Sequence, residues 1–89
     1  MSHAENSDAD AVLKRLRWRC RRGTRELDQL VGWWLDERHS IAPAEQQLAF
    51  AQLLEAQDPD LWDWVMGRGR PDDAEQAAIV DAIRSRHQL

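Results

Sequence analysis

The sequence contains few residues that could cross-link the fold covalently or through a metal, and no segment that could anchor it in a membrane. Its 89 residues include a single cysteine, which cannot form an internal disulfide. No group of cysteine and histidine residues has the spacing of a zinc site. The longest apolar run is far shorter than the ~20 residues needed to span a bilayer. These absences exclude a disulfide scaffold, a structural-zinc module and a membrane-inserted protein.

Features of a targeting peptide are also missing from the N-terminal segment. Residues 1–7 are small or polar and lack the apolar centre of a signal peptide. A mitochondrial transit peptide would be rich in arginine and poor in acids, whereas this region contains Glu5 and Asp8. We therefore expect a bacterial, cytoplasmic protein with a flexible N-terminal tail over residues 1–7 and a single domain over residues 8–89.

No segment alternates polar and apolar residues with a period of two, so no strand is predicted. Apolar residues instead recur three and four positions apart along most of the chain. This pattern predicts an all-α fold, a compact single domain of five helices. The expected helices cover residues 8–22, 25–40, 43–56 and 59–66, followed by a last helix that begins at residue 73.

Capping residues set the expected ends of these helices. Serine, threonine and aspartate accept hydrogen bonds from the free N–H groups of a first turn. Glycine adopts the left-handed conformation that closes a helix. By these rules the N-caps are Ser7, Thr24, Asp58 and Asp72, and the helices end at Gly23, Gly67 and Gly69.

Each expected helix has one apolar face that should enter the core. Leu48 points away from the face of its own helix, which suggests that this helix is packed on two sides. The predicted core residues are Ala9, Val12, Leu13, Leu16 and Cys20; Leu27, Leu30, Val31 and Trp34, with Leu35 at the edge; Phe50, Leu53 and Leu54; Leu61, Trp64 and Val65; and Ile79, Val80 and Ile83.

Residues suited to catalysis are few and scattered. His3, His39 and His87 lie in the tail, at a helix end and near the C-terminus, so they do not converge on a site. Cys20 lies on an apolar face and is predicted to be a core residue rather than a nucleophile. The glycine pair at residues 67 and 69 is too short for a phosphate-binding loop. We predict no catalytic residue, no metal ligand and no tightly bound cofactor, so the chain is not expected to be an enzyme.

The net charge of −4 hides a strong asymmetry along the chain. Residues 14–25 carry +7 with no acid, whereas residues 1–13 carry −3 and residues 26–89 carry −8. A basic helix on an otherwise acidic protein indicates a surface that is presented to a partner. Nucleic acid is disfavoured as that partner, because the acidic remainder would repel a polyanion and no groove-reading motif is present.

Trp18 lies about half a turn away from the apolar face of its helix. It could stack under neighbouring arginines or pack against another helix. It could equally be an exposed aromatic anchor within a basic patch, which is a residue type that dominates interfaces. Both interpretations fit the cations that surround it in the sequence, which are Lys14, Arg15, Arg21 and Arg22.

The connection between the first two helices has an ordinary structural explanation. A glycine can end the first helix, and Glu26 and Asp28 are favourable acids in the first turn of the second. This explanation does not account for the concentration of Arg22, Arg25 and Glu26 at one exposed corner.

Two separated segments resemble one protein family. Residues 18–28 resemble the signature of the small FAD assembly factors that flavinylate succinate dehydrogenase, the SdhE/YgfY-like family. The hallmark of that family, Arg-Gly-x-x-Glu, is present here as Arg22, Gly23 and Glu26. Residues 58–66, followed by Gly69-x-Pro71 and residues 73–75, resemble the later half of the family.

This resemblance implies a five-helix fold and a protein partner. The family binds the flavoprotein subunit of succinate dehydrogenase, and of fumarate reductase, and promotes covalent attachment of FAD to a histidine of that subunit. FAD would then be handled on the partner, and the chain would act as a monomer and not as an enzyme. The alternative is an antitoxin-like module, because relatives have also been described as neutralising a neighbouring toxin. The partner-binding residues implied are Trp18, Arg22, Gly23, Arg25, Glu26 and Asp28.

Overall fold

A computed structural model describes residues 3–89 and the side chains from residue 11 onward. All regular structure in this part of the chain is helical, which confirms the all-α prediction. The elements, in chain order, are α1 (His3–Arg19), α2 (Arg25–Glu37), the short 3-10 helix η1 (His39–Ile41), α3 (Ala44–Leu53), α4 (Asp58–Val65) and α5 (Ala74–His87).

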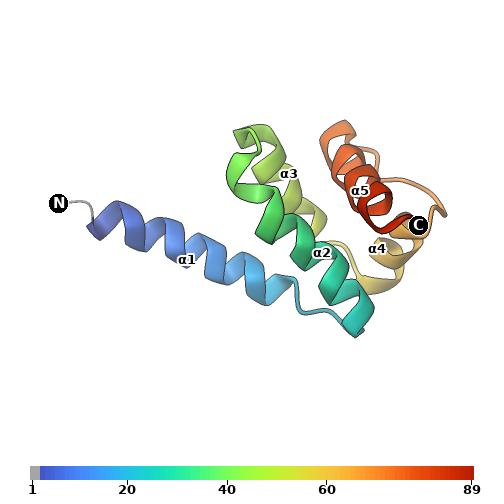
Figure 1. Ribbon diagram of the computed structural model, residues 1–89, viewed down its shortest axis with the longest axis horizontal. Helices are drawn as coiled ribbons and strands as arrows, with labels where there is room; N and C mark the ends of the chain where they lie inside the picture. The colour runs from blue at the N-terminus through green and yellow to red at the C-terminus, as the bar shows by residue number, and fades with distance from the viewer. Residues whose placement is uncertain (1–2) are drawn as a thin grey trace.

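Helices α2 to α5 pack together, while α1 projects from them to one side (Figure 1). The molecule is accordingly elongated, with principal extents of 47 × 25 × 21 Å. Among the side chains described in this region, Leu16 near the end of α1 and Cys20 directly after it reach the core. Val12 and Leu13 are 48% and 40% exposed, so their predicted burial is wrong. The helical pattern predicted one apolar face, but at Val12 and Leu13 no other element covers that face. The predicted core position Ala9 lies outside the described side chains.

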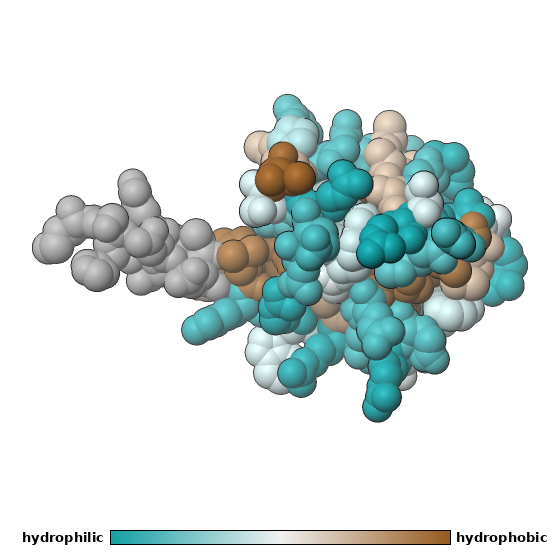
Figure 2. Space-filling view, viewed as in Figure 1, coloured by the Kyte–Doolittle hydropathy of each residue, from teal (hydrophilic) through white to brown (hydrophobic). Residues whose placement is uncertain are grey.

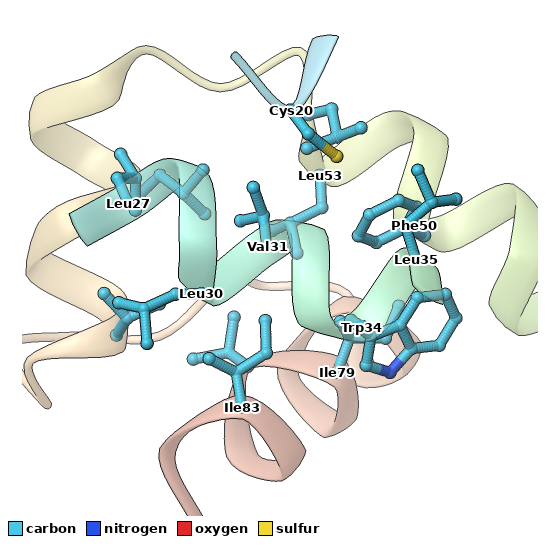
Figure 3. Close-up of a cluster of buried hydrophobic side chains, with 14 of the residues drawn as sticks. Cys20, Leu27, Leu30, Val31, Trp34, Leu35, Phe50, Leu53, Ile79 and Ile83 are labelled. Atoms are coloured by element: carbon cyan, nitrogen blue, oxygen red, sulfur yellow. The ribbon is translucent and has the colours of Figure 1, made fainter. Parts of the chain in front are cut away.

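The core surrounds α2, whose apolar face is buried as predicted (Figure 3). The ring of Trp34 stacks on Phe50 of α3, with centroids 4.6 Å apart and planes 25° apart. Helix α5 packs against both α2 and α3 and contributes Ile79 and Ile83. The predicted core residues of α2, α3 and α5 are confirmed, as are Leu61 and Val65 of α4, while Trp64 is only partly buried.

Leu48 of α3 is 61% exposed, so the prediction that this helix is packed on two sides is wrong. Among the residues described, no helix is both long enough and apolar enough to cross a membrane.

The first helix differs from the prediction at both ends. It begins at His3, before the expected cap at Ser7, and its last helical residue is Arg19. Gly23 therefore does not end α1, and its φ is not in the left-handed region. Gly67 and Gly69, with φ of 85° and 95°, do follow the end of α4 as predicted.

Of the other three expected N-caps, one is correct and two are displaced. Thr24 caps α2 as predicted, since its Oγ1 accepts a hydrogen bond from the N–H of Leu27. Asp58 is the first residue of α4, and its carboxylate is directed to other partners, described below. The cap of α5 is Asp73, which accepts from the N–H of Gln76 at 2.9 Å, and not Asp72.

Candidate partner-binding site

Arg22, in the loop between α1 and α2, is the centre of the hydrogen-bonding network at the predicted corner. Its side chain is only 10% exposed, and its Nε donates to Asp58 Oδ1 at 2.7 Å. Its Nη1 donates at 2.9 Å to the carbonyls of Arg19 and Leu54, and its Nη2 donates to the carbonyl of Ala56. Arg22 therefore ties the end of α1 to the end of α3 and the start of α4.

The main chain of the loop is held by two carboxylates. The N–H of Arg22 donates to Asp28 Oδ1, and the N–H of Gly23 donates to Asp58 Oδ2 at 2.5 Å. A Cβ at residue 23 would lie 2.8 Å from that same Oδ2. Glycine is favoured here by the close approach of the Asp58 carboxylate, because a larger residue would displace a group that Arg22 also holds.

The predicted partner-binding residues divide into two groups. Arg22 and Asp28 are partly buried and make their polar contacts within the chain, so Arg22 does not belong to an exposed corner as the sequence suggested. Trp18, Gly23, Arg25 and Glu26 are exposed. Arg22 and Asp28 hold the loop in place, and the four exposed residues are accessible to a partner.

Trp18 is the most exposed tryptophan in the described structure, at 68%. The guanidinium of Arg21 lies over its ring, 4.9 Å from the centroid, so the predicted stacking and the predicted exposure both occur. Figure 2 shows an apolar patch on α1 beside the part drawn in grey. Shallow hollows lie on either side of Trp18, lined by Val12, Arg15, Leu16 and Arg19 on one side and by Lys14, Arg17 and Arg21 on the other.

Most cations of the basic segment are not neutralised within the described structure. Arg17 pairs with Asp36 of α2 at 2.5 Å, and Arg22 pairs with Asp58. Among the side chains described, no ion pair is formed by the other five, which are Lys14, Arg15, Arg19, Arg21 and Arg25. This surface can attract an acidic partner.

Cys20 is 5% exposed and packs in the core. Burial raises the pKa of its thiol to about 11, so the sulfur stays protonated at neutral pH. The prediction that Cys20 is a core residue is confirmed. Among the side chains described, those of residues 11–89, no three of His, Cys, Asp and Glu gather in a way that could hold a metal ion.

Sequence reasoning missed the role of Asp58, which it assigned to a helix cap. Its carboxylate bonds Arg22 and Gly23, which lie 36 and 35 positions earlier in the chain. The available signal was the second resembling segment, which begins at this residue.

One known protein family matches most of the chain. The family described as "Flavinator of succinate dehydrogenase" matches residues 14–87. The chain belongs to this family. The resemblance stated from the sequence is thus confirmed, and the flavinator match includes the corner and α4 but not residues 3–13 of α1.

Relatives within the flavinator family are similar over most of their length. The chain is 46% identical over 69 residues to the FAD assembly factor SdhE of Aliivibrio fischeri, covering 78% of this chain and 80% of the relative. The protein of the same name from Vibrio vulnificus is 45% identical with the same coverage. That from Yersinia pseudotuberculosis is 44% identical over 75 residues, covering 83% of this chain and 84% of the relative.

Proposed function

We propose that this chain is an assembly factor that binds the flavoprotein subunit of succinate dehydrogenase, and of fumarate reductase, and promotes covalent attachment of FAD to that subunit. The membership of the flavinator family and the names of the relatives support this function. The observation that carries it is the corner itself. The buried Arg22 holds the loop from inside, and Glu26 of the same Arg-Gly-x-x-Glu hallmark is left exposed.

The chain need not supply a catalytic group for this function. Covalent attachment can use the reactivity of the flavin itself, once the acceptor histidine and the isoalloxazine ring of the partner are aligned. A protein that binds the aligned conformation more tightly than the others increases its population by that difference in affinity. FAD is then a cofactor of the partner, and this chain acts on it only through the flavoprotein.

The contacts of the corner suggest a division of roles. Arg22 and Asp28 are positioning residues, because they hold the loop and face inward. Gly23 allows the loop to approach Asp58, and its exposed side leaves room for the main chain of the partner. Glu26 can accept hydrogen bonds from the partner, Trp18 can serve as an aromatic anchor, and Arg25 can attract an acidic surface. We place this reaction in the bacterial cytoplasm, with the chain acting as a monomer.

The first prediction concerns Glu26. In a strain that lacks the gene, covalent flavin fluorescence in the succinate dehydrogenase band should be lost, and the wild-type gene should restore it. The Glu26→Ala variant should fail to restore it, although the circular dichroism of the purified variant should remain helical, because the Glu26 side chain is exposed and makes no ion pair within the described structure.

The matched control is Glu45→Ala, which removes another exposed glutamate from a helix first turn, that of α3. It should restore flavinylation fully. Unchanged fluorescence in the deletion strain would refute the function, and co-purification of a toxin with no flavoprotein would favour an antitoxin instead. An unfolded Glu26→Ala protein would show that the corner is only structural.

A further inference from the structure

A second surface begins at Glu26 and runs away from the basic segment. Between α2, α4 and the end of α5 lies an open hollow of about 290 Å³. Its apolar lining comes from Leu30 of α2, Trp62 of α4, Met66 directly after α4, and Leu89 at the C-terminus, which lies beside α4 in Figure 1. Glu26 stands at its polar edge.

Trp62 also borders a second hollow of about 270 Å³, lined by Thr24, Leu27 and Pro59. Trp62 and Met66 pack against the buried core from outside and remain partly exposed. The two hollows therefore share Trp62 as a lining residue. The second hollow adjoins the α1–α2 loop, since Thr24 caps α2.

The charge at the edge of this surface is opposite to that of α1. The carboxylate of Glu26 forms no ion pair with any side chain that the structure describes. The other ionisable side chains at the two hollows are His87 and Asp58, of which Asp58 is paired with Arg22, and no arginine or lysine lines either hollow. An apolar recess with one free carboxylate at its edge is complementary to an apolar side chain that is followed by a basic group.

We propose that this hollow receives an apolar side chain of the flavoprotein subunit, presented next to a basic group that pairs with Glu26. The inference rests on the proposed function and extends its interface from the corner to α4 and the C-terminus. Trp62 becomes a binding residue, and Glu26 contributes to both parts of the interface. The basic face of α1 and the hollow select opposite charges, so the partner can dock in only one orientation.

Titration calorimetry with the purified apo flavoprotein subunit tests this inference. Trp62→Ala should weaken binding about 30-fold, which is the usual effect of removing an interface anchor. Because Trp62 also touches the core, a second variant is needed. Gln29→Lys adds a long cation at an exposed position of the hollow, where it should obstruct the apolar side chain and repel the basic group. We expect at least about tenfold weaker binding with an unchanged melting temperature.

The matched control is Gln52→Lys, which makes the same exchange at an exposed position of α3 that lines neither hollow. It should bind like the wild type. If Glu26→Ala weakens binding while Gln29→Lys binds normally, the hollow is not part of the interface and the inference fails alone. If the wild type does not bind the flavoprotein, the proposed function fails first. A wild-type dimer that Gln29→Lys dissociates, with flavoprotein affinity unchanged, would assign the hollow to self-association and overturn the inference.

Discussion

The guanidinium of Arg22 is enclosed by one carboxylate and three main-chain carbonyls, while the carboxylate of Glu26, in the first turn of α2, faces solvent. At the scale of the residue, these two members of the hallmark have different partners: Arg22 bonds groups of its own chain, and Glu26 is free to contact another molecule. The arginine neutralises Asp58 and satisfies carbonyls at helix ends, which would be costly to bury without donors. The glutamate is available to another molecule. An Arg22 variant that loses function could therefore have lost the conformation of the α1–α2 loop as well as a contact with the partner.

His39 is the one polar residue buried in the described core, at 7% exposure, and it makes edge contacts with Trp34 and Phe50. Its Nδ1 is buried without a hydrogen-bond partner in the described structure. Burial lowers the pKa of His39 below its ordinary value of 6.5, because the charged ring would lose its hydration. The core therefore favours the neutral ring over the protonated ring.

This environment predicts a loss of stability in mild acid. As the pH falls through 6.5, the unfolded chain binds a proton at His39 and the folded chain resists it, so the free energy of unfolding should decrease by up to about 1.4 kcal/mol per pH unit. Above that pH both states are neutral, and His39 should contribute no pH dependence. Urea denaturation between pH 5 and pH 8 measures the slope.

The variant His39→Leu should remove this slope, whatever it does to stability at pH 8. His87→Gln should retain it, because the ring of His87 contacts Trp33, whereas that of His39 contacts Trp34 and Phe50. An equal slope in His39→Leu would locate the titrating group elsewhere.

At the scale of the element, apolar periodicity predicted the helices well, whereas capping preferences predicted the helix ends less well. Periodicity predicted α2 and its buried face, because that face is covered along its whole length. The same periodicity in α1 contains no information about neighbouring helices, so it did not show that α1 projects away from α2 (Figure 1). Helix ends depend on competition between nearby polar side chains, which is why Asp58 was taken for a cap although its carboxylate bonds the loop after α1.

The start of α5 gives a direct test of such a competition. Asp73→Ala should lower the free energy of unfolding by about 1 kcal/mol, because its carboxylate accepts the hydrogen bond from the Gln76 N–H. The neighbouring Asp72→Ala should change it by no more than about 0.5 kcal/mol, as expected for an exposed residue that caps nothing. Chemical denaturation at pH 7 compares the two. Similar losses in both variants would mean that the cap is shared or misassigned.

At the scale of the whole molecule, charge is separated in space as well as in sequence. The basic segment lies on α1 and the loop after it, and the remaining described residues from Glu26 onward carry −8. Such a distribution orients an approaching partner over distances of about one Debye length, ~8 Å at physiological salt.

The association rate with the flavoprotein subunit should therefore depend on salt and on which arginine is changed. Arg25→Glu should slow association several-fold at low salt, because it reverses a charge on the basic surface beside Glu26. Arg86→Glu makes the same reversal at an exposed position near the end of α5 and should have a smaller effect. Stopped-flow measurements at low and at physiological ionic strength distinguish them. Equal effects of both variants at low salt would indicate attraction by net charge alone.

The sequence by itself determined the helical class, the core faces of α2, α3 and α5, the burial of Cys20 and the family. These features depend on residue spacing within one helix or on short sequence motifs, so they can be read locally. Only the tertiary structure decided that Arg22 turns inward, that Asp58 holds the loop of Gly23, that Val12 and Leu13 stay exposed, and that Trp62 and Leu89 share a hollow with Glu26. Each of these depends on which distant segment a side chain meets, and that is set by the packing of the helices.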